Sequence, residues 1–75
     1  MDQLAKAVGE RVRYRRRACG LSQDNLALLS GIDRSYVGRI ERGEVNITVE
    51  KLYRIAKVLV CEPATLLPKI QDIHS

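Results

Sequence analysis

Residues 21–43 read LSQDNLALLSGIDRSYVGRIERG, and this stretch decides the fold. Ser22 is a favourable N-cap and Gly31 can adopt a positive φ without penalty, so a short helix is predicted between them. Asp33 is a second N-cap, and the helix that follows it is expected to end at Gly43. The stretch therefore predicts two short helices joined by a tight glycine turn.

The second of these helices is expected to have one apolar face and one basic face. Val37 and Ile40 recur at helical spacing and are expected to point into a core. Leu26 and Leu29 are expected to do the same in the preceding helix. The outward positions carry arginine. The major groove of B-DNA accepts one α-helix, and the helix that precedes it in such a pair crosses the DNA backbone. The pattern predicts a helix-turn-helix unit that binds double-stranded DNA.

Three further helices are predicted outside this stretch, and no segment shows the alternation of a β-strand, so the fold class is all-α with five helices. The first covers about residues 2–19, with Asp2 as its cap. The fourth begins after Thr48, and the fifth is very short and begins at Pro63. The tail, residues 69–75, is expected to fray. The inward stripe of the first helix is predicted to be Leu4, Val8, Val12 and Cys19. The fourth helix carries apolar residues at three- and four-residue intervals, namely Val49, Leu52, Ile55, Ala56 and Leu59.

A chain of 75 residues forms one domain, residues 1–75, with the helix-turn-helix at about 22–43 and a dimerisation region at about 55–70. The net charge is +4, and residues 11–42 hold eight arginines against three acids. Arginine suits phosphate and guanine because its planar fork donates paired hydrogen bonds. Charge alone is also compatible with an ordinary solvated basic face.

Several function classes are not expected. No apolar run approaches the roughly 20 residues that span a bilayer, and the N-terminus lacks the apolar core of a signal peptide, so a cytoplasmic protein without membrane contact is predicted. Cys19 and Cys61 lack zinc-ligand spacing and are interpreted as half-buried free thiols. The only histidine, His74, lies in the tail. We expect no catalysis, metal, cofactor or small-molecule ligand.

From about residue 12 to residue 67 the chain resembles the lambda-repressor-like, or Xre-type, helix-turn-helix family. Within that family it is most similar to the controller proteins of restriction-modification systems, through residues 33–37 and 40–42. In this pattern Gly38 replaces a small polar residue, Ile47 a proline and Val60-Cys61 a frequent glycine. The resemblance is carried by Leu21-Ser22-Gln23, Leu26-Ala27, Ser30-Gly31, Val37, Ile40-Glu41-Arg42-Gly43 and Leu52-Ile55-Ala56-Leu59.

The resemblance implies a transcriptional regulator that binds a palindromic operator as a homodimer and controls its own gene and the endonuclease gene. It also implies a structural ion pair between Arg16 and Glu41. The alternatives are a phage-type repressor or antitoxin-like autoregulator and, in another class, a protein-interaction module with the same fold.

The residues expected to touch DNA lie on or next to the two short helices. Arg34 can donate two hydrogen bonds to the O6 and N7 of guanine. Gln23 begins a helix whose N-terminal amides point at phosphate. Tyr36 is interpreted either as a core residue or as a phosphate donor. The predicted base contacts are Arg34, Ser35 and Arg39, and the predicted phosphate contacts are Gln23, Tyr36, Arg42, Asn46 and Arg17.

The C-terminal part of the chain carries more apolar residues than so small a core requires, which predicts a dimer interface. The alternative is that these residues close the base of the monomer core. Tyr53, Ile55 and Leu59 are assigned to the core or the interface. The predicted interface residues are Val60, Cys61, Pro63, Leu66, Leu67 and Ile70.

Overall fold

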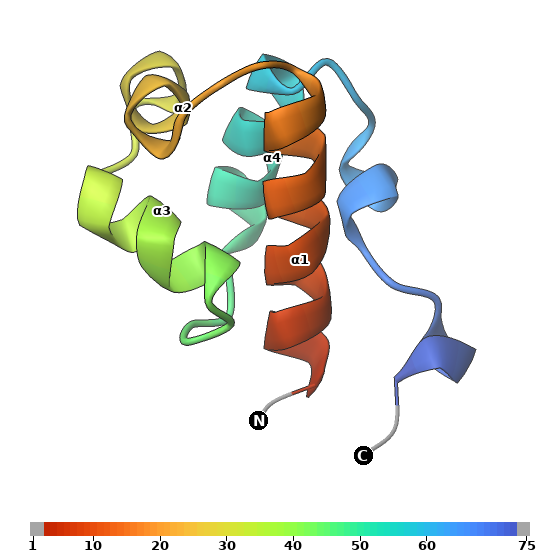
Figure 1. The fold of residues 1–75 in the computed structure, drawn as a ribbon. Helices are drawn as coiled ribbons and strands as arrows, with labels where there is room; N and C mark the ends of the chain where they lie inside the picture. Colours follow the sequence, from red (N-terminus) through yellow and green to blue (C-terminus); the bar gives the residue numbers. More distant parts are fainter. Residues whose placement is uncertain (1–2, 74–75) are drawn as a thin grey trace.

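The computed structural model describes residues 3–73, and no strand occurs among them. Figure 1 shows a bundle in which both ends of the described chain lie at the same end of the molecule. The predicted all-α fold class is confirmed. The fifth helix is a single 3₁₀ turn, and a second 3₁₀ turn stands where a frayed tail was expected. The elements are α1 (Gln3–Ala18), α2 (Gln23–Ser30), α3 (Arg34–Glu41), α4 (Val49–Val58), η1 (Pro63–Leu66) and η2 (Ile70–Asp72).

Side-chain caps begin three of the four α-helices where the sequence predicts them. Ser22 accepts a hydrogen bond from the backbone N–H of Asn25 at the start of α2. Asp33 and Thr48 cap α3 and α4 in the same way. Gly31 ends α2 with a φ of 71°. The predicted cap of α1, Asp2, lies outside the described residues. These caps satisfy backbone donors that would otherwise lack partners, and they determine where each helix begins.

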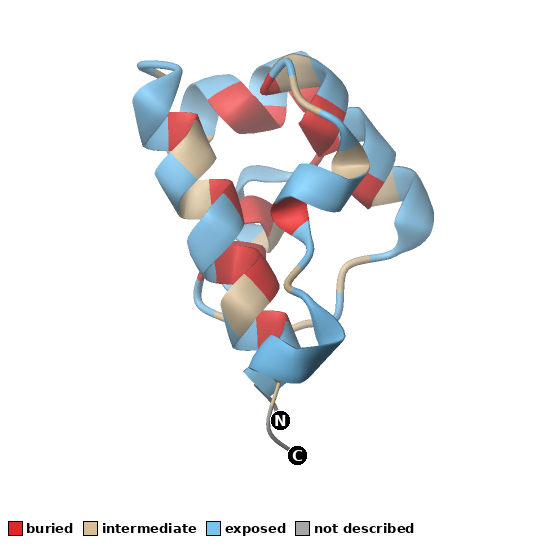
Figure 2. Ribbon diagram, turned by 90° about the vertical axis from the view of Figure 1, so that its right-hand side faces the viewer, coloured by how far each residue is buried: buried red, intermediate tan, exposed pale blue. Residues whose placement is uncertain are grey.

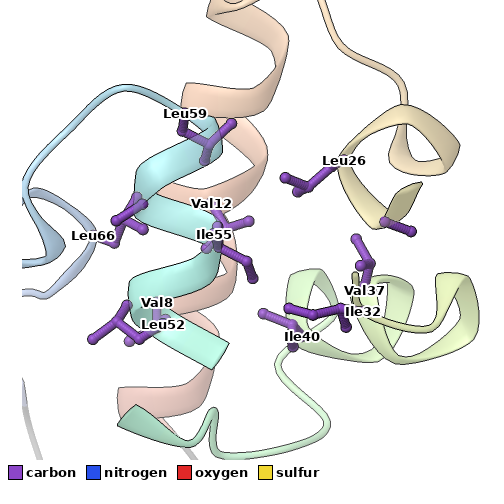
Figure 3. Close-up of a cluster of buried hydrophobic side chains, with 12 residues drawn as sticks. Val8, Val12, Leu26, Ile32, Val37, Ile40, Leu52, Ile55, Leu59 and Leu66 are labelled. Carbon is purple, nitrogen blue, oxygen red and sulfur yellow. The ribbon is translucent and has the colours of Figure 1, made fainter. Parts of the chain in front are cut away.

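The core lies between α1, α4 and the helix-turn-helix pair (Figure 3). Helix α3 packs on α1 and α2, α2 packs on α4, and η1 packs on both α1 and α4. Figure 2 shows the buried residues on the faces that the helices turn toward one another. The largest fully buried side chains are Val12, Leu26, Val37, Ile40, Ile55, Leu59 and Leu66.

Three residues predicted to point inward are exposed instead, namely Leu4, Leu29 and Cys19, and Val49 of the fourth helix is exposed as well. Helix α2 turns Leu26, Ala27 and Ser30 toward the core, which leaves Leu29 on the outer edge of its stripe, 61% exposed. Leu4 and Val49 lie in the first turns of α1 and α4, where Ala5 and Leu52 are the residues that face the core. Helical spacing predicts a face but not how much of that face a neighbouring element covers.

Two glycines allow α1 to approach the end of α3 closely. A Cβ atom at Gly9 would lie 2.3 Å from the carbonyl oxygen of Ile40, and one at Gly43 would lie 2.8 Å from the Cα of Lys6. Both contacts are with backbone, so no side-chain movement could relieve them. Gly43 also has a φ of 73°, which favours glycine. The close contact between α1 and α3 therefore depends on these two positions.

The turn that follows α4 has a valine in the left-handed region, where glycine is usual. Val60 has a φ of 55°, and the N–H of Cys61 donates to the carbonyl of Ala56 at 3.1 Å, which is the bond of a Schellman motif. Arg15 donates from Nη2 to the carbonyl of Val60 at 3.1 Å and from Nε to that of Leu59 at 3.4 Å. The end of α4 is thus closed by α1, in spite of an unfavourable residue at the turn.

Candidate nucleic-acid interface

Packing of its inner face fixes the position of helix α3, and its basic face points outward. Val37 and Ile40 are buried in the core, and Glu41 is buried beside α1. Arg34, Ser35, Arg39 and Arg42 are exposed. The cationic groups therefore lie on a helix whose position is fixed by packing, as a rigid reader of a groove requires.

A buried ion pair joins α3 to α1. Arg16 donates from Nε to Oε2 of Glu41 at 2.6 Å and from Nη2 to Oε1 at 2.9 Å. The Glu41 side chain is fully buried, and the Arg16 side chain is 10% exposed. Arg16 Nη1 also donates to the carbonyl of Leu21 at 2.9 Å, which ties the start of the helix-turn-helix to α1. This pair acts as scaffold, because its atoms face one another and not solvent.

Burial by itself would raise the pKa of the Glu41 carboxyl group. Hydrogen bonds from Arg16 and Gln23, together with the charges of Arg16 and Arg13, outweigh burial and lower this pKa below its usual value. Arg13 Nε lies 3.6 Å from Oε1 of Glu41. The carboxylate is therefore stable as an anion because three side chains surround it.

Gln23 is turned toward this pair. Its Nε2 donates to Oε1 of Glu41 at 2.9 Å, and the residue is half-buried. The sequence predicts only a phosphate contact for Gln23. It does not predict this hydrogen bond, because nothing in the spacing of two residues 18 apart indicates that they are in contact. Its phosphate contact stays a prediction.

The arginines on the outer face of α3 have acidic partners within the chain. Arg34 Nε lies 2.7 Å from Oδ1 of Asp24 on α2. Arg42 donates from Nε and Nη2 to the two carboxyl oxygens of Glu44, at 2.8 and 3.3 Å. Arg39 Nε is 4.0 Å from the same carboxylate. The hydrogen bond from Arg42 lowers the pKa of Glu44 and so favours the charged form of this carboxylate.

Ser35 and Tyr36 are less available than the arginines. The Ser35 hydroxyl is bonded to the Asp33 carboxylate, and this bond and the one from the Ser35 backbone lower the pKa of Asp33. Tyr36 is half-buried against the core, and Lys51 Nζ lies 5.1 Å from the centre of its ring. Tyr36 is therefore partly a core residue, and its phosphate contact stays a prediction.

The remaining predicted site residues lie at three places. Arg17 is exposed in the last turn of α1, and Asn46 is exposed in the loop between α3 and α4. Leu66 is fully buried in the monomer core, so its assignment to the interface is wrong: η1 packs it between α1 and α4. The other predicted interface residues are exposed or half-buried, namely Val60, Cys61, Pro63, Leu67 and Ile70.

The C-terminal segment lies on the opposite side of the molecule from α3 (Figure 1). Val60 is 79% exposed and Ile70 is 88% exposed. Tyr53, left open between core and interface, is exposed, whereas Ile55 and Leu59 belong to the core. An apolar surface is thus available without covering the basic face of α3.

Within residues 3–73 there is no cluster of side chains that could hold a metal ion. In the same part of the chain, no helix is both long enough and apolar enough to cross a bilayer.

Comparison with known proteins gives consistent matches. The profile of the family described as Helix-turn-helix (HTH_3) matches residues 12–66. Control protein C.SmaI of Serratia marcescens is 39% identical over 67 residues, which is 89% of this chain and 75% of that protein. The restriction-modification controller protein C.AhdI from Aeromonas hydrophila has a TM-score of 0.82 and 46% identity, over 84% of this chain and 96% of that one. The biofilm regulator SinR, solved in complex with DNA, has a TM-score of 0.76 and 32% identity, over 79% and 95% of the two chains.

Proposed function

The chain belongs to the helix-turn-helix family and is a DNA-binding transcriptional regulator, and from this premise we propose that it is a homodimeric controller of a restriction-modification system. It acts on its own promoter and on that of the endonuclease gene. Regulation is its activity, and no catalysis is assigned to it. Its site of action is the cytoplasm, where the DNA is.

The observation that carries the proposal is the outward, rigidly held basic face of α3. Arg34, Arg39 and Arg42 project from a helix that the core and the Arg16–Glu41 pair fix in place. The similarity to C.SmaI and C.AhdI extends over most of each chain, which supports the controller class over the other regulators of the family.

In this proposal Arg34, Ser35 and Arg39 contact base edges in the major groove. The phosphate contacts come from Gln23, Tyr36, Arg42, Asn46 and Arg17. Arg34 lies in the first turn of α3, the part of a recognition helix that reaches base edges in this motif. Arg34→Ala should weaken binding by about 1–3 kcal/mol and relax the preference at one base pair of each half-site.

The dimer is proposed to form through the exposed apolar residues after α4, at Val60, Leu67 and Ile70. A two-fold axis there places two copies of α3 in successive major grooves about 34 Å apart and requires a palindromic operator. Leu67→Asp combined with Ile70→Asp should produce a folded monomer with weak operator affinity. A wild-type chain that sediments as a monomer at tens of micromolar and still binds tightly would contradict the dimer.

The deciding experiment uses duplex DNA from immediately upstream of the protein's own gene, with a shuffled duplex of equal length as control. Log affinity should fall linearly with log salt concentration, by about 0.9 per neutralised phosphate. The upstream duplex should bind more tightly than the shuffled one at every salt concentration. Equal affinity for the two duplexes, or no dependence on salt, would overturn the proposed function.

A further inference from the structure

Gly38 lies in the middle of α3, on the face that carries the arginines, and no backbone contact requires a glycine there. A Cβ atom at this position would lie 3.0 Å from Nη1 of Arg42 and 3.3 Å from Nη1 of Arg34. Both atoms are the ends of flexible side chains, in contrast to the carbonyl oxygen that excludes a side chain at Gly9. Glycine destabilises a helix interior relative to alanine, so packing does not explain its presence here.

The space at Gly38 is filled by the two arginines. Arg34, Gly38 and Arg42 are spaced four residues apart and form one row on the helix surface. Gly38 is buried although it faces outward, because the guanidinium groups of its two neighbours in the row cover it. Two like charges are thereby brought toward the same point, and each has a carboxylate beside it, Asp24 for Arg34 and Glu44 for Arg42.

The two carboxylates hold their arginines differently. Glu44 accepts hydrogen bonds from the Nε and Nη2 of Arg42, and these two bonds occupy one edge of that guanidinium group. Asp24 accepts only from the Nε of Arg34, and the two Nη groups of Arg34 donate no hydrogen bond to any of residues 3–73. The free edge is the one that can donate to guanine O6 and N7. Arg34 is therefore oriented and still able to read a base.

We propose that Gly38 and Asp24 determine sequence specificity by positioning the Arg34 guanidinium for a guanine. Gly38 leaves the space in which Arg34 lies, and Asp24 fixes its Nε. The inference rests on the proposed DNA binding. Asp24 is an exposed anion on the surface that faces phosphate, so it weakens binding to every duplex. Asp24 weakens non-specific binding more than specific binding. The reason is that only the contact with guanine uses the orientation of the Arg34 guanidinium group that Asp24 fixes.

The test is selection from a duplex library with a randomised centre, using the wild type, Asp24→Asn, Gly38→Ala and the control Glu10→Gln. Glu10 is an exposed acid on α1, so its substitution makes the same change in net charge away from α3. Asp24→Asn should bind random-sequence duplex severalfold more tightly than the wild type. It should also lose about tenfold in preference for the guanine selected by the wild type.

Gly38→Ala should raise Tm by roughly 4 °C, because alanine favours the helix, and should lower the same preference severalfold. Asp24→Asn should leave Tm nearly unchanged, because an exposed ion pair contributes little to stability. Loss of preference in a protein of equal or higher stability is a result that a merely structural role would not produce.

The outcomes distinguish a failure of the proposed function from a failure of this inference alone. A wild type that selects no sequence overturns the proposed function, and this inference with it. A wild type that selects a sequence, with both variants keeping the full preference, overturns only the inference. The same holds if Glu10→Gln loses as much preference as Asp24→Asn, because net charge would then explain the effect.

Discussion

The middle of α3 and the end of α4 depart from the preferences of a helix in opposite directions. Gly38 is a glycine where a side chain would stabilise the helix, and Val60 is a valine with a φ of 55° where glycine would relieve strain. The contact between α1 and α3 shows no such departure, since Gly9 and Gly43 are glycines that the backbone requires.

The difference indicates what each region is for. Residues between α1 and α3 agree with the local geometry, as expected where stability is the only demand. Gly38 lies on the arginine-bearing face of α3, which is proposed to read DNA, and the exposed Val60 lies after α4, at the surface proposed to hold a second copy. A residue that lowers the stability of its own helix or turn, and gains no contact within the chain in return, is typical of surfaces that serve binding. The predictions that follow test this contrast.

The largest effect is expected inside the contact between α1 and α3. Glu41→Gln removes the carboxylate that Arg16 needs, and a buried guanidinium group cannot lose its proton. Breaking such a pair costs about 3–5 kcal/mol in free energy of unfolding. Urea denaturation measures it, with Glu44→Gln as the exposed control. A loss no greater than that of the control would show that the pair does not hold the helices together.

The same carboxylate should make stability depend on pH. The pKa of Glu41 in the folded protein is below its usual value of 4.5, so its contribution to stability is complete above about pH 4.5. As pH falls below that value the unfolded chain binds a proton first, and the free energy of unfolding decreases until the folded pKa is passed. Denaturation from pH 6 downward should show a decline that is smaller in Glu41→Gln. Parallel curves for the two proteins would contradict this.

The third prediction compares the two glycines directly. Gly9→Ala places a Cβ against the carbonyl of Ile40 and should destabilise the protein by about 1–3 kcal/mol, the usual cost of overpacking. Gly38→Ala should stabilise it by about 0.5–1 kcal/mol, because only arginine tips must move. Thermal unfolding distinguishes the signs. If both changes were destabilising, Gly38 would be required by the fold and would not be a feature of the DNA face.

Much of this architecture follows from the sequence, because caps and turns act locally. Ser22, Asp33 and Thr48 begin their helices where the residue types predict, and Gly31 ends α2. The basic outer face of α3 also follows from the sequence. Only two positions of this helix are apolar and point inward, so the arginines must lie on the other faces. Local chemistry therefore predicts the helix-turn-helix with little error at its ends.

The parts that the sequence did not predict depend on contacts between distant segments. Asp24 and Arg34 are ten residues apart on different helices, so their bond depends on the angle of the turn. The number of apolar residues near the C-terminus predicts Leu66 at the interface, but η1 packs on α1 and α4 and buries Leu66 in the monomer core. Leu29 has helical spacing, but α2 turns Leu26, Ala27 and Ser30 toward the core and leaves Leu29 exposed. Which residues a neighbouring element covers, and the angle between two helices, are set only when the whole core assembles.

The smallest effect is expected at Val60. A β-branched residue in the left-handed region is strained, whereas glycine adopts it freely but loses more entropy on folding. Val60→Gly should therefore raise the free energy of unfolding by about 1 kcal/mol. Val49→Gly is the matched control: both valines are exposed, at 71% and 79%, but Val49 is in a right-handed helix, so its substitution should destabilise the protein slightly.

The same variant tests why a strained valine is present. If the exposed Val60 side chain packs against a second copy, Val60→Gly should weaken self-association while the monomer gains stability, and Val49→Gly should leave self-association unchanged. Sedimentation across a concentration series, read beside the urea curves, measures both quantities on one sample. A gain in stability with unchanged self-association would remove Val60 from the dimer surface and leave its conformation without a functional reason. Loss of stability in Val60→Gly would instead show that the closing bonds from Arg15 require the valine turn.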